Sequence, residues 1–153
     1  MSKREFLRGP FRMGSTKGTR RGQMLTSNQR HILVVEDDAK LAQLIATQLQ
    51  WGGYLVHAES SGLSAIRYAT EHFIQLAILD LKLPDISGYE VCEKLRKTYT
   101  SWALPILLVT ALCEPIDQLH GFACGADAYL TKPFDMTEFL EIVAALFGER
   151  ATA

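Results

Sequence analysis

A chain of 153 residues with 48% hydrophobic and 22% charged side chains has the composition of a single globular domain. No apolar run approaches the roughly 20 residues that a membrane helix requires, so we expect no membrane partner. The net charge of −1 is unevenly distributed, because residues 1–30 carry eight basic side chains against one acidic, whereas residues 31–153 carry eight basic and sixteen acidic. The globular part is therefore acidic.

The first 30 residues are rich in glycine and basic side chains and show no sustained periodicity, which is typical of a flexible leader outside the fold. Their arginine-rich, acid-poor composition would also suit a transit peptide, a nucleic-acid-binding arm or residues left from cloning. We predict three parts: a leader over residues 1–30, a folded domain over 31–148 and a short tail over 149–153.

The cysteines, Cys92, Cys113 and Cys124, are odd in number and include no C-x-x-C pair, which fits neither a disulfide framework nor a zinc site. This pattern predicts a reducing cytoplasm and three small, buried, apolar thiols. The four histidines are scattered without the spacing of metal ligands, and we expect them on the surface or as satisfied core residues.

From His31 onward, short apolar runs alternate with amphipathic stretches, which predicts β-α units and a parallel sheet covered on both faces. The predicted strands are 32–35, 54–58, 76–79, 106–109 and 128–130. The predicted helices are 38–51, 61–71, 87–98, 115–123 and 135–147. Right-handed crossovers between such units give an open, doubly wound α/β sheet with its site at the carboxyl ends of the strands.

Local chemistry supports several boundaries. Asp37 or Asp38 can cap the first helix, Gly52-Gly53 can end it, and Pro115 suits the first position of the fourth. Apolar residues at i, i+3 and i+4 predict stripes that face the core in the first and last helices. These are Leu41, Leu44, Ile45 and Leu49, and Phe139, Ile142, Val143 and Leu146.

Polar residues follow the predicted strands at their carboxyl ends. Adjacent strand ends lie roughly 5 Å apart, so these side chains can converge in one cleft. They are Glu36, Asp37, Asp80, Thr110 and Lys132.

Three carboxylates in one pocket raise each other's pKa unless a cation offsets them, and Mg²⁺ is the cation that suits a few hard oxygen ligands. For Glu36 and Asp37 alone, a rim of solvated carboxylates remains an alternative. Asp80 directly follows an apolar strand, a position that suits a nucleophile forming an acyl phosphate. Lys132 and Thr110 would then supply an ammonium and a hydroxyl to the phosphoryl oxygens.

The chain resembles the receiver domain of bacterial two-component response regulators over residues 31–147. Four motifs carry the resemblance in order: Ile32–Asp38, Leu79–Gly88, Val109–Ala111 and Leu130–Phe134. The resemblance implies a flavodoxin-like fold of five parallel strands in the order 2-1-3-4-5 with five helices.

The resemblance also implies that Asp80 accepts a phosphoryl group from the phosphohistidine of a sensor histidine kinase or a histidine phosphotransfer protein. Mg²⁺ would be held by Glu36, Asp37, Asp80 and the backbone carbonyl of Lys82. Such a receiver catalyses its own phosphoryl transfer and slow autodephosphorylation, and is a signalling switch rather than an enzyme. Glu36 departs from the aspartate of many members, which preserves the charge and changes the reach by one methylene.

Thr110, Ala111 and Lys132 would bind the phosphoryl group, and Lys132-Pro133 resembles the family's cis peptide. Thr110 and Tyr129 would act as the switch that alters the face made by the fourth helix, the fifth strand and the fifth helix. Lys82 and Leu112 occupy positions that influence the rate of dephosphorylation in receivers.

The chain stops after the last predicted helix and includes no output segment, so we expect either a free-standing receiver or part of a longer regulator. Its partner would be a downstream protein or a missing output domain, and it could form a homodimer on phosphorylation. We expect no direct binding to nucleic acid.

A phosphate-independent pseudo-receiver is the main alternative, although it would normally lack a site residue. A haloacid-dehalogenase-type enzyme would require an aspartate where Lys82 stands, and no G-x-G-x-x-G supports a Rossmann site.

Overall fold

The computed structural model describes residues 29–149, so nearly all of the predicted leader and most of the predicted tail lie outside the described residues. Within the described part, no helix is long and apolar enough to cross a membrane. The strands are β1 (His31–Val35), β2 (Leu55–Glu59), β3 (Leu76–Leu79), β4 (Ile106–Thr110) and β5 (Ala128–Thr131). The helices are α3 (Ala39–Trp51), α4 (Gly62–Glu71), α5 (Gly88–Arg96), α6 (Pro115–Ala123) and α7 (Met136–Leu146).

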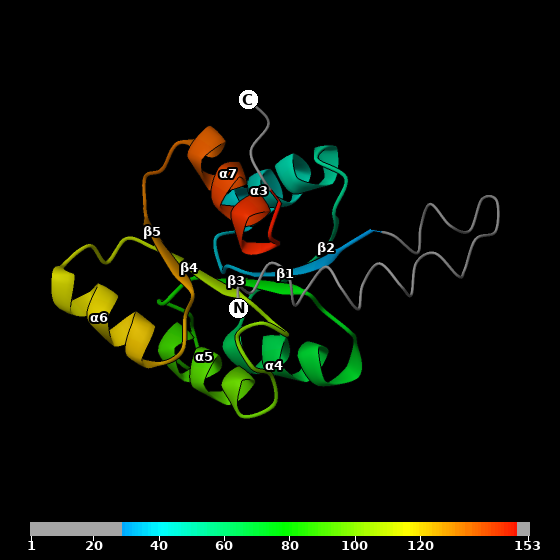
Figure 1. Ribbon diagram of the computed structural model, residues 1–153. Coiled ribbons are helices and arrows are strands. Elements are labelled where there is room, and N and C mark those ends of the chain that lie inside the picture. The colour runs from blue at the N-terminus through cyan, green and yellow to red at the C-terminus, as the bar shows by residue number, and fades with distance from the viewer. Residues whose placement is uncertain (1–28, 150–153) are drawn as a thin grey trace.

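The five strands form one parallel sheet in the order β2-β1-β3-β4-β5, which confirms the predicted doubly wound topology. Helices α3 and α7 cover one face, and α4, α5 and α6 cover the other (Figure 1). Alternate residues of β1 enter the two cores that result. Ile32 and Val34 pack with α3 and α7, whereas Leu33 and Val35 pack with α4 and α5. Burial on both faces explains why the central strands are continuous apolar runs.

The observed boundaries follow the predicted chemistry closely. The Asp38 carboxylate accepts hydrogen bonds from the N–H groups of Lys40 and Leu41 and caps α3, and Gly52 ends that helix. Pro115 occupies the first turn of α6. The largest difference lies in α5, which ends at Arg96, two residues earlier than predicted.

Two burial predictions are wrong. Leu44 is 49% exposed, because α3 faces the core through Ala42, Ile45 and Leu49 and a helix buries only a limited stripe. Cys113 is exposed in the connection between β4 and α6, whereas Cys92 and Cys124 are buried as predicted. Connections between elements run over the protein surface, so the Cys113 thiol lies outside the hydrophobic core.

Three histidines gather around Tyr68 on α4, although their sequence spacing shows no pattern. The rings of His57 and His72 both stack on the ring of Tyr68, with centroids 3.7 and 3.9 Å away. The Tyr68 hydroxyl is hydrogen-bonded to Nε2 of His31 at 3.0 Å. Packing of α4 against the sheet brings these side chains together, so the grouping depends on tertiary structure.

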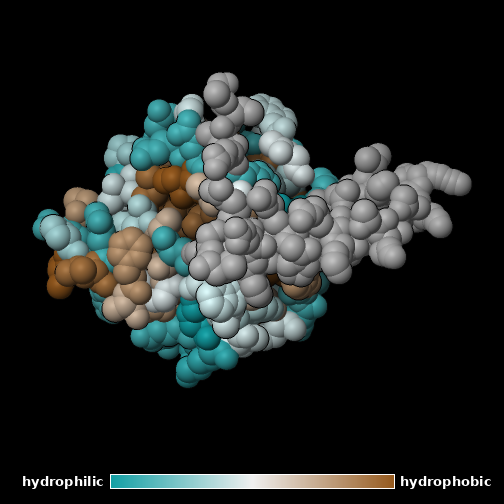
Figure 2. Space-filling view, in the orientation of Figure 1, coloured by the Kyte–Doolittle hydropathy of each residue, from teal (hydrophilic) through white to brown (hydrophobic). Residues whose placement is uncertain are grey.

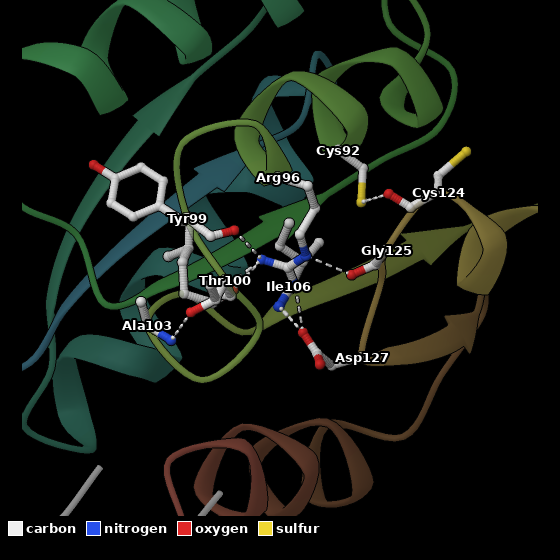
Figure 3. Close-up of polar contacts among 10 residues, drawn as sticks. Cys92, Arg96, Tyr99, Thr100, Ala103, Ile106, Cys124, Gly125 and Asp127 are labelled. Carbon is white, nitrogen blue, oxygen red and sulfur yellow. Dashed lines mark hydrogen bonds and ion pairs between the residues drawn. The ribbon is translucent and has the colours of Figure 1, made fainter. Parts of the chain in front are cut away.

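Arg96, in the last turn of α5, joins the ends of three elements (Figure 3). Its guanidinium donates to the carbonyls of Leu104 and Gly125 at 2.7 and 2.8 Å and pairs with Asp127 at 2.6 Å. The Asp127 carboxylate also accepts the N–H of Ile106, the first residue of β4. Because the Asp127 side chain is only 7% exposed, this pair holds α5 against the connections that enter β4 and β5.

The largely buried Arg96–Asp127 pair predicts a large stability effect. Replacing Asp127 by alanine leaves the Arg96 guanidinium without its anion and the Ile106 N–H without its acceptor. We expect the free energy of unfolding to fall by about 3 kcal/mol in urea denaturation at pH 7. The exposed Glu141→Ala on α7 is the control and should change it little. Equal midpoints for wild type and Asp127→Ala would contradict this role.

Candidate functional site

The predicted site residues lie at the carboxyl edge of the sheet. Glu36 and Asp80 directly follow β1 and β3, which are paired up to Val35 opposite Leu79. Thr110 ends β4 opposite Thr131 of β5, and its carbonyl accepts the N–H of Lys132 at 2.8 Å. The parallel register therefore brings the ends of four strands together.

Lys132 connects two of the carboxylates. Its Nζ donates to Oε1 of Glu36 and to Oδ2 of Asp80, each at 2.9 Å. The side chains of Glu36 and Asp80 are only 4% and 7% exposed, so water screens this contact poorly. The ammonium offsets the repulsion between two buried anions.

Glu36, Asp37 and Asp80 each place a carboxylate oxygen within 4.8 Å of the others, and Asp37 is the exposed member. Hard oxygen donors grouped in this way, with one side open to solvent, suit a divalent cation that retains water ligands. The three residues therefore fit the Mg²⁺ site that the resemblance implies.

The charge balance also favours a cation. Burial raises the pKa of Glu36, and the hydrogen bond from Lys132 only partly opposes this shift. Burial disfavours the charge of Lys132, but its hydrogen bonds to Asp80 and Glu36 outweigh this and raise its pKa. Lys132 thus contacts two of the three grouped acidic side chains, and a divalent cation would relieve the remaining repulsion.

The backbone around Asp80 is tightly held. Its N–H donates to the carbonyl of Val35 at 3.0 Å, and its Oδ1 accepts the N–H of Lys82 at 3.2 Å. Gly88, the first residue of α5, packs against the carbonyl group of Asp80 so closely that any Cβ there would collide with it. Glycine at position 88 lets α5 begin directly beside the acidic residue.

Leu112 links the two predicted switch residues, a contact that sequence reasoning missed. Its N–H donates to Oγ1 of the fully buried Thr110 at 3.4 Å, and its carbonyl accepts the Tyr129 hydroxyl at 2.8 Å. Burial raises the pKa of Tyr129 to about 12, so this hydroxyl remains a donor at neutral pH. Ala111, between Thr110 and Leu112, is exposed at the mouth of the site.

An apolar hollow of about 480 Å³ lies beside Lys132. The exposed Leu44 and its neighbour Leu41 border it from α3, and Phe134 and the cis peptide Lys132-Pro133 border it from the connection after β5. The helical spacing of Leu44 signalled a core residue, but the hollow lies between α3 and this connection, which only the fold brings together.

Sequence and structure comparisons agree with this geometry. The family model of the response regulator receiver domain matches residues 32–144. The DNA-binding dual master transcriptional regulator RpaA of a Synechocystis species is 39% identical over 115 residues, which are 75% of this chain and 48% of that protein. The regulatory protein VanRc of Enterococcus gallinarum is 42% identical over 113 residues, 74% of this chain and 46% of that protein. The chain therefore spans about half the length of these curated relatives.

Solved structures show the same fold. A CheY-like response regulator receiver domain protein from Methanospirillum hungatei superimposes with a TM-score of 0.74 at 28% identity, covering 78% of this chain and 94% of that one. A putative response regulator from Chloroflexus aurantiacus gives a TM-score of 0.74 at 31% identity, covering 79% and 99%.

The doubly wound sheet and the acidic centre at its carboxyl edge define a receiver-type signalling domain. The chain belongs to the response regulator receiver domain family.

The carboxylate cluster predicts that Mg²⁺ stabilises the fold. At a concentration ten times its Kd, bound Mg²⁺ should raise the free energy of unfolding by about 1.4 kcal/mol. Asp37→Asn should reduce this increase, which thermal unfolding at constant ionic strength measures. The adjacent Asp38 caps α3, and asparagine caps helices about as well as aspartate, so Asp38→Asn should change the basal stability little and keep the full Mg²⁺ increase. Equal increases in wild type and Asp37→Asn would exclude Asp37 as a ligand.

Proposed function

We propose that Asp80 accepts a phosphoryl group from the phosphohistidine of a sensor histidine kinase or a histidine phosphotransfer protein, with Mg²⁺ as cofactor. The observation that carries this proposal is the contact of Lys132 with both Asp80 and Glu36, inside a cluster of three carboxylates. A carboxylate held beside an ammonium and a fitting cation site is equipped to receive a phosphoryl group.

In the proposed reaction, a carboxylate oxygen of Asp80 forms the new O–P bond while the P–N bond of the donor phosphohistidine breaks. The electron pair of that bond stays on the imidazole nitrogen. The transferred group carries charge on its three outer oxygens, which require donors and cations. Mg²⁺, held by Glu36, Asp37, Asp80 and the Lys82 carbonyl, would supply positive charge at these oxygens.

The chain's own residues supply the rest. The Lys132 ammonium, already within hydrogen-bonding distance of Asp80, would bind one phosphoryl oxygen, and the Thr110 hydroxyl another. Ala111 presents only a methyl group at the mouth of the site and leaves the phosphorus accessible. In the later hydrolysis, water attacks the phosphorus, the O–P bond to Asp80 breaks and inorganic phosphate leaves. The domain thereby resets itself and is a switch rather than an enzyme with a separate substrate.

The readout we propose is the face made by α6, β5 and α7. Movement of the Thr110 hydroxyl toward the phosphoryl group would break its hydrogen bond with Leu112, whose carbonyl holds the Tyr129 hydroxyl. Exposed apolar side chains on α6 support a partner at this face, and a hydrophobic area is visible where α6 lies in Figure 2. The exposed apolar side chains of α6 are Ile116, Leu119 and Phe122, which are 68%, 65% and 46% exposed.

We further propose that residues 31–148 act on an output segment of a longer regulator, on a separate downstream protein or on a second phosphorylated copy. The length of the curated relatives, about twice the matched region, supports an output segment. The free thiols of Cys92, Cys113 and Cys124 support a cytoplasmic location.

The phosphoacceptor is tested with a small phosphodonor. On incubation with acetyl phosphate and Mg²⁺, the wild type should gain the mass of one phosphoryl group in intact mass spectrometry. Asp80→Asn should gain none, since an amide is not a nucleophile of this kind, whereas Asp38→Asn should gain as the wild type does. A gain that survives Asp80→Asn, or no gain in the wild type, would refute the mechanism; the second result would favour a pseudo-receiver.

The switch is tested by substitution of Tyr129. Tyr129→Ala should take up phosphate at a rate within about twofold of wild type, because the ring is not in the acidic site. The phosphorylation-dependent amide shifts of α6 in NMR spectra should be lost, since the ring that connects Leu112 to α6 is absent. Tyr129→Phe keeps the ring and loses only the hydroxyl bond to Leu112, worth about 1 kcal/mol, and separates the two contributions. Unchanged α6 shifts in both variants would remove Tyr129 from the readout.

A further inference from the structure

The connection between β3 and α5 runs from Asp80 to Gly88. Within it, Asp85 is hydrogen-bonded to the beginning of another helix, α4. The Oδ1 and Oδ2 atoms of Asp85 accept the N–H groups of Gly62 and Leu63 at 2.8 Å each, and Oδ1 also accepts the N–H of Ile86 at 2.8 Å. Gly62 and Leu63 open α4, more than twenty residues away in sequence.

The beginning of α4 has its own cap as well. Ser61 is the N-cap residue, and its hydroxyl accepts the N–H of Ser64. The N–H groups of Gly62 and Leu63 are not bonded by Ser61 and donate to Asp85 instead. Two separate parts of the chain therefore cap one helix. The hydrogen bond from Leu63 is the largest cause that lowers the pKa of Asp85, to about 2, so the carboxylate is ionised at neutral pH.

The contact is close on both sides. A Cβ at Gly62 would lie 2.6 Å from Cγ1 of Ile86, so the first residue of α4 rests directly on the residue after Asp85. Gly88 closes the connection by donating its N–H to the carbonyl of Leu81 at 2.9 Å. Asp85 and Gly88 therefore restrain the far end of the connection.

Lys82 lies between two restrained points. On one side, its N–H donates to Oδ1 of Asp80, and the buried Leu81 anchors the chain in the core. On the other side, Asp85 follows three residues later and is bonded to α4. The direction of the Lys82 carbonyl thus depends on a short segment whose two ends are fixed.

We propose that Asp85 is a positioning residue of the metal site, which holds the connection to α4 so that the Lys82 carbonyl is presented to Mg²⁺. This inference rests on the function proposed above, in which that carbonyl is a ligand. Without the anchor, residues 82–86 would gain backbone freedom, and Mg²⁺ binding would have to order them. Loss of a residue that orients a ligand typically weakens metal affinity 10- to 100-fold.

A purely structural role for Asp85 makes a different prediction. If Asp85 only stabilised α4, then removing the helix's other cap should have the same effect on Mg²⁺. Ser61→Ala is therefore the matched control, because it removes a cap of α4 and leaves the connection after β3 untouched. Each substitution removes capping hydrogen bonds at the same helix end, but only Asp85→Ala frees the segment that contains Lys82.

The experiment is a Mg²⁺ titration followed by amide shifts in NMR spectra, without phosphodonor, for wild type, Asp85→Ala and Ser61→Ala. We expect Asp85→Ala to weaken the Kd for Mg²⁺ about tenfold and Ser61→Ala to stay within twofold of wild type. At low Mg²⁺, the rate of phosphorylation by acetyl phosphate should likewise be lower in Asp85→Ala than in Ser61→Ala and wild type. At saturating Mg²⁺, Asp85→Ala should approach the wild-type rate, because Asp85 touches no reacting atom.

Wild-type affinity in Asp85→Ala would overturn the inference, as would equal weakening in Asp85→Ala and Ser61→Ala. If Asp85→Ala does not fold, Asp85→Asn, which keeps one acceptor oxygen, takes its place under the same criteria. If the wild type binds Mg²⁺ and is phosphorylated on Asp80, and the Asp85 variants behave in the same way, only the role of Asp85 is refuted. If the wild type neither binds Mg²⁺ nor takes up a phosphoryl group, the proposed function and this inference are refuted together.

Discussion

The contact of the Lys132 ammonium with Asp80 and Glu36 is the interaction on which the organisation of this domain depends. Two nearly buried carboxylates beside each other repel strongly, and a cation at 2.9 Å from both makes their burial tolerable. The three side chains come from the ends of β1, β3 and β5. They meet because the strands are parallel and because β1 and β5 lie on either side of the neighbouring strands β3 and β4. The topology thus brings together the groups of the site.

The surrounding structure keeps this centre rigid on one side and leaves it open on the other. Apolar strands buried on both faces fix the positions of the strand ends. Gly88 and Asp85 restrain the connection after Asp80, and Arg96 with Asp127 ties α5 to the entries of β4 and β5. By contrast, Asp37 and Ala111 face solvent, where the cation and the phosphodonor of the proposed function would enter. A supported site with an open edge would suit the proposed transfer from another protein, because the acceptor is already held in position.

The route from the site to the surface is short. Thr110 is bonded to Leu112, and Leu112 to Tyr129, so two hydrogen bonds separate the proposed phosphate ligand from the aromatic residue next to α6. The exposed apolar residues of α6 would face the partner in the proposed readout. The chain spans about half the length of its curated relatives, and in the proposed function this face would communicate with the rest of a longer regulator.

The sequence by itself determined the five strands and five helices to within about two residues, their α/β class and the residues at the carboxyl edge. These features depend on local periodicity, capping chemistry and motif spacing, which are written along the chain. The strand order needed the resemblance to receivers, and the structure confirmed it. Only the tertiary structure decided that Leu44 is exposed, that three histidines meet on Tyr68 and that Asp85 caps α4. Such contacts join residues far apart in sequence, and no local pattern encodes a distance that is set by the packing of whole elements.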